Sequence, residues 1–398
     1  MMRKQDSEAV TKSPLVVGRY YPEIDGLRAL AVMIVIYFHS ALMAGPDRVA
    51  VDAATIWDAG RFYYEFTMIG WCGVDLFFVI SGFLITGILM DTANQQKCFR
   101  NFYIRRTLRI FPLYYAVLIF SFLLFVLFYG TTFTLRFSLY FLYLQNWFSV
   151  FGYDYILYFE HFWSLAIEEQ FYIFWPVVFV WAYRRGIVEP VLFVLIFLSF
   201  LFRFYLAAKW QLNMAFSITP SRLDGLLLGA GLVYLLSRQD DPRRLNVIFA
   251  RGMAVSLAAV CLLALLNGNL WGRDREVLMF GIFPVSLFFA SFLGWVVTAD
   301  EEHLIRRFFR LSFLREIGKV SYGMYVYHWL IMCVIVQQEI MNHQGFTFIH
   351  TVLLATGAPL SFIVAWTSFR YFEKPFLRLK DVYARYSEAD GALPPAKI

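Results

Sequence analysis

The sequence predicts an all-α polytopic membrane protein with about ten transmembrane helices and one short re-entrant or interfacial segment. Three observations support this fold class: 60% of the 398 residues are apolar, only 16% are charged, and the mean hydropathy is +0.59. Soluble globular proteins carry about 25% charged residues. Long apolar stretches recur along the whole chain, so we expect a bundle of membrane-spanning helices without a second, soluble domain.

Ten apolar stretches are long enough to cross a bilayer as helices. They are residues 27–44, 67–90, 110–129, 162–183, 188–208, 221–236, 252–268, 277–298, 319–341 and 349–372. An eleventh stretch, 134–148, is short and aromatic. We assign the spans to one transmembrane domain, residues 20–378, which follows a cytoplasmic tail, 1–19, and precedes a second cytoplasmic and disordered tail, 379–398.

Basic clusters in the loops predict the orientation of the spans. If segment 134–148 does not cross the membrane, every cluster falls on the same side; if it crosses, the clusters from Arg184 onward change sides. The positive-inside rule therefore favours ten crossings with both termini in the cytoplasm. The net charge of +6 comes from these clusters, so we attribute it to membrane topology and contacts with membrane lipids, and we expect no nucleic-acid partner. The four cysteines are scattered without metal-ligand spacing, and we expect neither disulfides nor a metal.

Arg28 and His39 are the first candidate functional pair. His39 lies eleven positions after Arg28, which is about three helical turns and about 16 Å, so the two side chains share one face of the first span. The topology places Arg28 at the cytoplasmic surface and His39 in the outer half of the membrane. Ionisable groups inside a span are costly and usually functional. The alternative is an arginine that anchors the span and a histidine satisfied by a neighbour.

His39 is the candidate general base, because histidine fills this role most often near neutral pH and a carboxylate can fix its tautomer. Asp75, Glu168 and Glu169 are predicted at a depth comparable with that of His39, and we group them with it as catalytic candidates. Adjacent glutamates on one helix point about 100° apart, so at most one of them should face His39. The alternative is that one glutamate forms a structural ion pair with an arginine such as Arg203 or Arg222.

Two further groups could bind a ligand. Arg106 and Arg109 lie three residues apart on one helical face and could hold a phosphorylated ligand, although arginines at this position also anchor topology. Ser321, Tyr325 and His328 follow i, i+4, i+7 spacing and could line a polar path through the bilayer. The alternative for these three is a set of interhelical hydrogen bonds that stabilises the bundle.

Several stretches together resemble the acyltransferase-3 family of membrane O-acyltransferases. In the family's order they are Ile24–Val32 with His39, Gly73–Gly87, Tyr103–Pro112, His161–Tyr172, Arg222–Gly225 with Gly229, Gly318–Tyr325 with His328, and Glu373–Pro375. The family's Arg-x10-His element falls on Arg28 and His39, and its Arg-x-x-Arg element falls on Arg106 and Arg109.

The resemblance implies transfer of an acyl group, usually acetyl, from cytoplasmic acetyl-CoA or another acyl-CoA to a hydroxyl of an envelope or secreted glycan. Arg28, Arg106, Arg109, Ser321 and Tyr325 are then candidates for acyl-CoA binding. The candidates for acceptor binding are Trp163, Arg222, Asp224 and His328.

The family is known mainly from bacterial inner membranes, and many relatives carry a C-terminal extracytoplasmic hydrolase-like domain. The chain stops soon after its last predicted span, so we expect a stand-alone form that works alone or with a separate envelope-assembly protein.

Two other function classes stay open on the sequence. A proton-coupled secondary transporter or exporter of a glycan or small metabolite would also use histidine and carboxylates within the membrane. The other alternative is a non-catalytic assembly factor in a polysaccharide-export complex. The sequence has no convincing internal repeat between its halves, and the arginine cluster has no role in proton coupling. Consumption of acyl-CoA distinguishes the acyltransferase from both.

Overall fold

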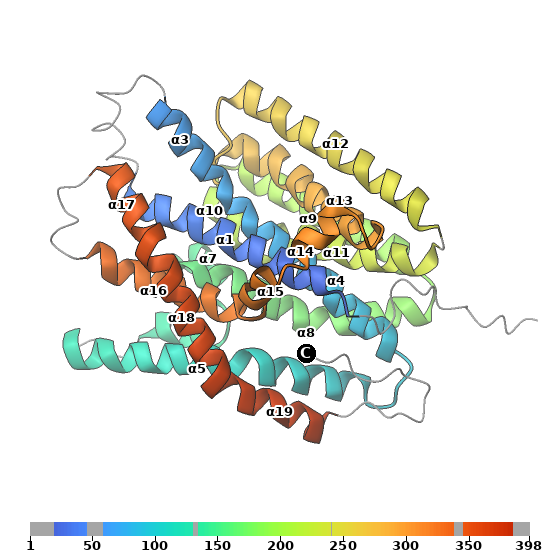
Figure 1. The fold of residues 1–398 in the computed structure, drawn as a ribbon, viewed down its shortest axis with the longest axis horizontal. Helices are drawn as coiled ribbons and strands as arrows, with labels where there is room; N and C mark the ends of the chain where they lie inside the picture. Colours follow the sequence, from blue (N-terminus) through green and yellow to red (C-terminus); the bar gives the residue numbers. More distant parts are fainter. Residues whose placement is uncertain (1–19, 46–58, 130–133, 240, 338–344, 385–398) are drawn as a thin grey trace, which may run out of the picture.

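The computed structural model describes residues 20–45, 59–129, 134–239, 241–337 and 345–384, and every regular element in them is helical (Figure 1). The predicted first tail, 1–19, lies outside the described residues, as does most of the second. The all-α polytopic fold predicted from composition is confirmed.

A helix occupies each of the ten predicted spans. The elements are α1 (Pro22–Ala44), α3 (Ala59–Met68) with η2 (Ile69–Cys72) and α4 (Gly73–Thr92), α5 (Cys98–Tyr129), η4 (Leu157–Phe162) with α8 (Trp163–Arg184), α9 (Val188–Ala208), α11 (Leu223–Arg238), α12 (Pro242–Asn267), η6 (Val277–Gly281) with α13 (Ile282–Thr298), α15 (Ser312–Lys319) with α16 (Ser321–Val336), and α17 (Phe346–Val352) with η8 (Leu353–Gly357), α18 (Ala358–Ser368) and η9 (Phe369–Glu373).

Eight helices in the described ranges are long and apolar enough to cross a membrane, and the α15–α16 pair, bent by 71°, makes nine. The remaining predicted span is α11, which has only 16 residues but packs along α4 in the middle of the bundle. Short helices complete the chain, among them α10 (Leu212–Ser217), η5 (Thr219–Ser221) and α14 (Leu304–Phe309). The last helix, α19 (Lys374–Tyr383), lies beside α5 and extends past the predicted domain boundary at residue 378 (Figure 1).

Segment 134–148 does not form a crossing helix. It consists of α6 (Leu135–Phe141), η3 (Gln145–Trp147) and the start of α7 (Phe148–Phe151), each too short to span a bilayer. Two fully buried amides fasten it to the bundle: Gln145 donates to the Phe162 carbonyl at 2.8 Å, and Asn146 donates to Thr219 Oγ1 at 2.9 Å. The expected re-entrant or interfacial piece is therefore a packed element of the helix bundle.

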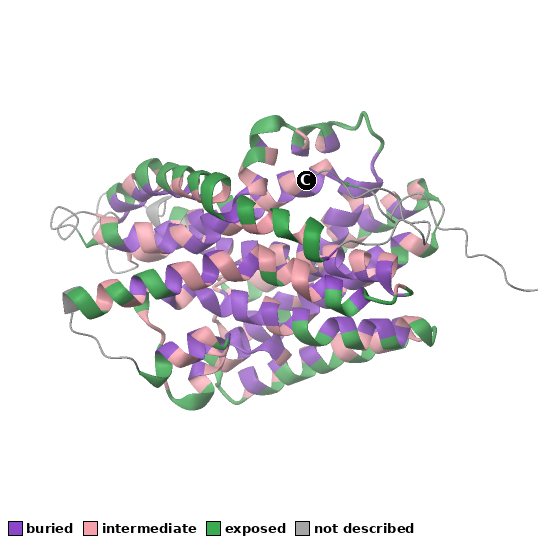
Figure 2. Ribbon diagram, turned by 90° about the horizontal axis from the view of Figure 1, so that it is seen from below, coloured by how far each residue is buried: buried purple, intermediate pink, exposed green. Residues whose placement is uncertain are grey.

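The outer helices expose apolar side chains, as expected of a protein whose surroundings are hydrocarbon. Only 11% of the apolar window of α12 is buried, and Leu262, Leu265 and Leu266 on it are exposed. Buried residues gather instead in the middle of the bundle (Figure 2). They make up more than half of each of the helices α1, α4, α8 and α11. The central helices therefore carry the candidate site.

Glycines let the central helices approach closely. A Cβ atom on Gly82 of α4 would lie 1.8 Å from the Leu226 carbonyl oxygen of α11, and one on Gly229 of α11 would lie 2.0 Å from the Val79 carbonyl oxygen. Small residues at such interfaces let helix backbones touch inside a membrane. The small residues of the Gly73–Gly87 stretch thus serve helix packing.

Glycine contacts also fix the start of α1. A Cβ atom on Gly26 would lie 2.1 Å from the Phe309 carbonyl oxygen, and one on Gly318 would lie 1.8 Å from the Asp25 carbonyl oxygen. Buried Glu23 adds an ion pair of 2.8 Å with Arg306. Backbone contacts from α14 and α15 thereby determine where Arg28, two residues after Gly26, enters the bundle. We call this end of the bundle, where α19 also packs against α5, the basic end.

Candidate active site

A cavity of about 880 Å³ lies between α1, α4, α5, α8, α16 and α19 at the basic end. This volume is within the usual range for small-molecule sites, about 300–1,000 Å³. Basic side chains outnumber carboxylates in its lining, and we call it the basic cavity. The basic residues that line it are Arg28, Arg105, Arg106, Arg109, Lys319, Arg370, Lys374, Arg378 and Lys380.

The three arginines predicted to bind a phosphorylated ligand meet in this cavity. Arg28 comes from α1, and Arg106 and Arg109 share one face of α5. The Arg106 guanidinium lies over the rings of Phe102 and Tyr172, at 5.9 and 5.5 Å from their centroids. Within the described part of the chain, Arg28 and Arg109 form no ion pair. Both cations are thus available to an anionic ligand.

Glu168 and Glu169 both line the basic cavity, and neither contacts His39. Ser81 of α4 donates a 2.6 Å hydrogen bond to Glu168 Oε1, whereas Glu169 Oε1 is buried with no hydrogen-bond partner among the described residues. The expected His39–glutamate pair is therefore wrong. The 3₁₀ turn η4 precedes α8, so both glutamates lie deeper in the bundle than a span beginning at residue 162 would place them.

Ser164 and Tyr325 close the deep end of the basic cavity. Ser164 Oγ lies 2.5 Å from the Tyr325 hydroxyl, which also donates to the His161 carbonyl at 2.8 Å. Ser321, one turn earlier on α16, lines the same cavity, and its fully buried hydroxyl has no partner among the described residues. Ser321 and Tyr325 thus share a wall of the cavity, as their spacing predicted.

Three histidines gather directly behind this closed end, and we call His39, His161 and His328 the histidine cluster. His39 Nδ1 lies 2.7 Å from His328 Nε2, with the two rings stacked at 5.1 Å. The His161 ring lies 5.1 Å from that of His328 and stacks on Trp329 at 5.8 Å. None of the three lines the basic cavity, but Tyr325, which does, packs its ring against those of His161 and His328.

His328 differs in role from the sequence expectation. Its Nδ1 lies 2.7 Å from the Tyr325 carbonyl oxygen, and its Nε2 faces His39. Both ring nitrogens of His328 thus bond other groups of the protein, so neither is available to bind an acceptor substrate in this structure.

Asp75, Arg222 and Asp224 belong to a buried ion-pair network. Arg222 bonds Asp75 at 3.0 Å, and Arg203 bonds Asp224 at 2.7 Å, with all four side chains at most 1% exposed. Ser286 also donates to Asp75 at 3.3 Å. Asp75 therefore does not support His39, and Arg222 and Asp224 do not line the basic cavity. The two arginines and the two aspartates of the network thus neutralise one another.

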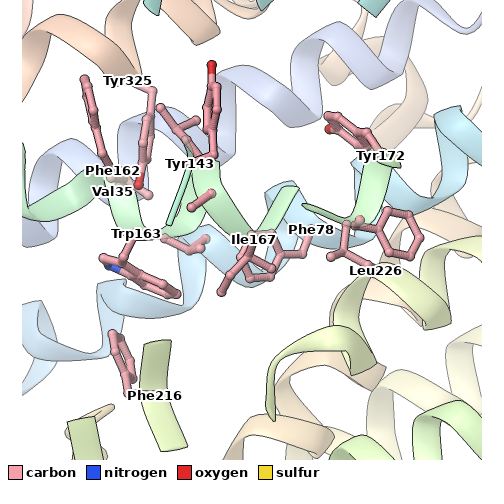
Figure 3. Close-up of a cluster of buried hydrophobic side chains, with 14 of the residues drawn as sticks. Val35, Phe78, Tyr143, Phe162, Trp163, Ile167, Tyr172, Phe216, Leu226 and Tyr325 are labelled. Carbon is pink, nitrogen blue, oxygen red and sulfur yellow. The ribbon is translucent and has the colours of Figure 1, made fainter. Parts of the chain in front are cut away.

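Trp163 packs between the rings of Phe78 and Phe216, beside this network. Its ring points at Phe216, 4.7 Å away, and the Arg222 guanidinium lies 5.7 Å from its centroid (Figure 3). The ring is 6% exposed. Trp163 thus covers Arg222 within the bundle.

No role of His161 or Ser164 follows from helical spacing or charge in the sequence. The only signal for them is their position in the His161–Tyr172 stretch that resembles the family. Both ring nitrogens of His161 are buried without a partner among the described residues. No group of three histidine, cysteine, aspartate or glutamate side chains in the described ranges could hold a metal ion.

Comparisons with known proteins identify the family of this chain. The acyltransferase-3 model, described as an acyltransferase domain, matches residues 21–370. Peptidoglycan O-acetyltransferase OatA of Listeria monocytogenes is 29% identical over 383 residues, which cover 90% of this chain and 56% of the relative. O-acetyltransferase OatA of Staphylococcus aureus is 29% identical over 390 residues, which cover 90% of this chain and 57% of the relative.

The chain thus spans a little over half the length of these relatives. No solved structure matches it. Because the family match extends over most of the sequence and includes Arg28, His39, Arg106 and Arg109, this chain belongs to the acyltransferase-3 family.

Proposed function

We propose that this protein transfers an acetyl group from acetyl-CoA to a hydroxyl of a glycan or a related envelope or secreted acceptor. The observation that carries the proposal is that the basic cavity, the Ser164–Tyr325 pair and the histidine cluster lie one after another in the bundle. The basic cavity leads to the Ser164–Tyr325 pair, and the histidine cluster lies directly behind that pair. Relatives named as O-acetyltransferases, one of them a peptidoglycan O-acetyltransferase, support acetyl as the group and a glycan as the acceptor.

The basic cavity suits coenzyme A, whose phosphates are anionic and whose long arm carries amides. Arg28, Arg106 and Arg109 would bind the phosphates, because arginine forms strong charge-assisted hydrogen bonds with phosphate oxygens. The unpartnered hydroxyl of Ser321 would bond an amide of the arm. The thioester would then lie at the closed end, beside Tyr325.

The topology follows from the positive-inside rule. The basic residues of the cavity belong at the cytoplasmic surface, which places the cavity mouth where acyl-CoA is made. The protein would then lie in the bacterial inner membrane with both termini in the cytoplasm. The acceptor would reach His39 from the opposite side.

His39 would act as the general base. It would take the proton of the acceptor hydroxyl, the oxygen would attack the thioester carbonyl, and the thiolate of coenzyme A would leave. Arg28 and His39 lie on one helix about 16 Å apart, a distance that the arm of coenzyme A must cover. The active residues would thus be arranged along α1 from the phosphates to the acceptor.

Reconstituted vesicles test the proposal. Purified protein in liposomes receives radiolabelled acetyl-CoA and a peptidoglycan fragment as acceptor, and the labelled fragment is quantified. We expect transfer by the wild type, transfer reduced at least about 100-fold in His39→Ala, and unchanged transfer in the control Arg244→Ala, an exposed arginine of α12. Full activity of His39→Ala would refute the role of His39. Movement of the fragment across the membrane without consumption of acetyl-CoA would favour the transporter.

A further inference from the structure

The hydrogen bonds of His328 determine which of its nitrogens carries the proton. Nδ1 lies 2.7 Å from the Tyr325 carbonyl oxygen and 3.1 Å from the Met324 carbonyl oxygen. A carbonyl oxygen only accepts, so Nδ1 must donate. In neutral His328, Nε2 is then unprotonated and can only accept.

The tautomer of His39 follows from that of His328. Its Nδ1 lies 2.7 Å from His328 Nε2, so Nδ1 of His39 must be the protonated donor of that bond. The second nitrogen of neutral His39, Nε2, is then a free lone pair, and no described residue bonds it. Nε2 is therefore the atom that can take a proton.

We propose that His328 is the positioning residue of His39: it fixes the tautomer in which Nε2 is the base, and it shares the charge that His39 acquires. The proposal rests on the acyl-transfer function described above. A carboxylate usually fills this place beside a histidine base. Here none of the three carboxylate candidates takes that place: Asp75 bonds Arg222, Glu168 bonds Ser81, and Glu169 lines the basic cavity.

The proton balance of the step is closed. The acceptor O–H bond breaks and an N–H bond forms at His39 Nε2 while the acceptor oxygen bonds the acyl carbon. The Nδ1 proton of His39 can shift to His328 Nε2, so the positive charge is spread over two rings stacked at 5.1 Å. When the acyl carbon–sulfur bond breaks, the Nε2 proton goes to the thiolate sulfur, and both histidines return to their neutral states.

Other titratable groups surround the pair. His161 of η4 lies 6.4 Å from His39 and 5.1 Å from His328, ring to ring, and Tyr325 of α16 lies 5.6 Å from His328. Arg273, between α12 and η6, also acts electrostatically on His39. No carboxylate contacts either ring in the described part of the chain. A proton held by the pair is thus stabilised by sharing and by the Tyr325 carbonyl.

Solid-state NMR of the protein with ¹⁵N-labelled histidine rings tests the tautomer directly. The chain has six histidines, so difference spectra against His39→Asn and His328→Gln assign the two rings. We expect His39 to carry its proton on Nδ1 in the neutral wild type. A proton on Nε2 of neutral His39 would overturn the proposal whether or not the protein transfers acyl groups. Conversely, an inactive wild type with the expected spectrum would refute only the proposed function.

Kinetics separate positioning from mere packing. His328→Leu removes the acceptor for His39 Nδ1, whereas the amide oxygen of His328→Gln can replace Nε2. We expect kcat to fall about 100-fold or more in the leucine variant, the KM for acetyl-CoA to stay within about 3-fold, and glutamine to restore kcat to within about 10-fold of wild type.

The matched control is His350→Gln, since His350 is also buried and bonds Tyr63 through Nδ1 at 2.9 Å. It should keep wild-type kcat. Equal loss of kcat in the leucine and glutamine variants, at unchanged thermal stability, would refute the positioning role.

Discussion

The hydroxyls of Ser164 and Tyr325 lie 2.5 Å apart, although the two positions are 161 residues apart in the chain. Both side chains lie at the deep end of the basic cavity. Tyr325 holds this position by donating to the His161 carbonyl as well. The pair therefore connects α8 and α16 at the point where the cavity and the histidine cluster come nearest.

Tyr325→Phe tests the importance of that connection. The substitution removes only the hydroxyl, so the His161 carbonyl loses its shorter hydrogen bond and keeps Ser164 Oγ, at 3.3 Å, as a donor. The loss of one such bond costs about 0.5–1.5 kcal/mol. We expect turnover of acetyl-CoA to fall at least about 10-fold, because the histidine cluster loses the hydrogen bond from Tyr325 to the His161 carbonyl. Affinity for acetyl-CoA should change less than about 3-fold, since the arginines are untouched. Turnover assays and calorimetric titration measure the two effects, and wild-type turnover in Tyr325→Phe would contradict this role.

Removing cationic charge from the basic cavity should weaken donor binding. Arg28→Ala and Arg109→Ala each remove a cation that lacks an ion pair among the described residues. A charged hydrogen bond contributes about 1.5–3 kcal/mol, so we expect the Kd of acetyl-CoA to rise roughly 10- to 100-fold. Calorimetric titration at two salt concentrations checks this, with Arg244→Ala as the control. Equal affinity in the two cavity variants and the control would exclude these arginines from the donor site.

The α4–α11 contact provides an internal comparison of two glycines. Gly82→Ala forces a Cβ to within 1.8 Å of the Leu226 carbonyl oxygen, whereas Gly87→Ala on the same helix meets nothing closer than a methyl of Val233 at 3.5 Å. Overpacking costs about 1–3 kcal/mol. We expect thermal unfolding in detergent to occur at a lower temperature for Gly82→Ala and at an unchanged or higher one for Gly87→Ala. Equal melting temperatures would mean that the two helices separate at little cost.

The buried ion pair should matter for stability through its balance of charge. Asp75→Ala leaves Arg222 buried and uncompensated, which costs about 3–5 kcal/mol. The double variant Asp75→Leu/Arg222→Met should regain most of that loss, because hydrophobic residues of similar size replace the pair. Denaturation curves of the single and double variants measure the coupling. As the control, Glu302→Ala removes one partner of the exposed ion pair with Arg307 and should leave the free energy of unfolding unchanged.

The sequence predicts correctly what lies along one helix. Arg28 and His39 share a face of α1, and Arg106 and Arg109 share a face of α5, because helical spacing alone decides these relations. Apolar length likewise finds the spans. These inferences are local and need no knowledge of neighbouring helices.

Contacts between helices were less predictable. His39 meets His328, 289 residues away, and Glu168 meets Ser81, 87 residues away. Hydropathy locates a span but leaves its rotation and depth undetermined, and the turn η4 changes the depth of Glu168 by more than a helical turn. Apolar length likewise does not reveal the 71° bend between α15 and α16 or the backbone contact at Gly318.

The backbone contacts of Gly26 and Gly318 have a consequence for evolution. Since main-chain atoms of Phe309 and Asp25 hold the start of α1, the place of Arg28 depends little on which apolar side chains surround it. The neighbouring leucines, isoleucines and valines can drift among themselves as long as the two glycines stay. Descendants of this chain could thus adapt to thicker or thinner membranes while their donor site stays in register.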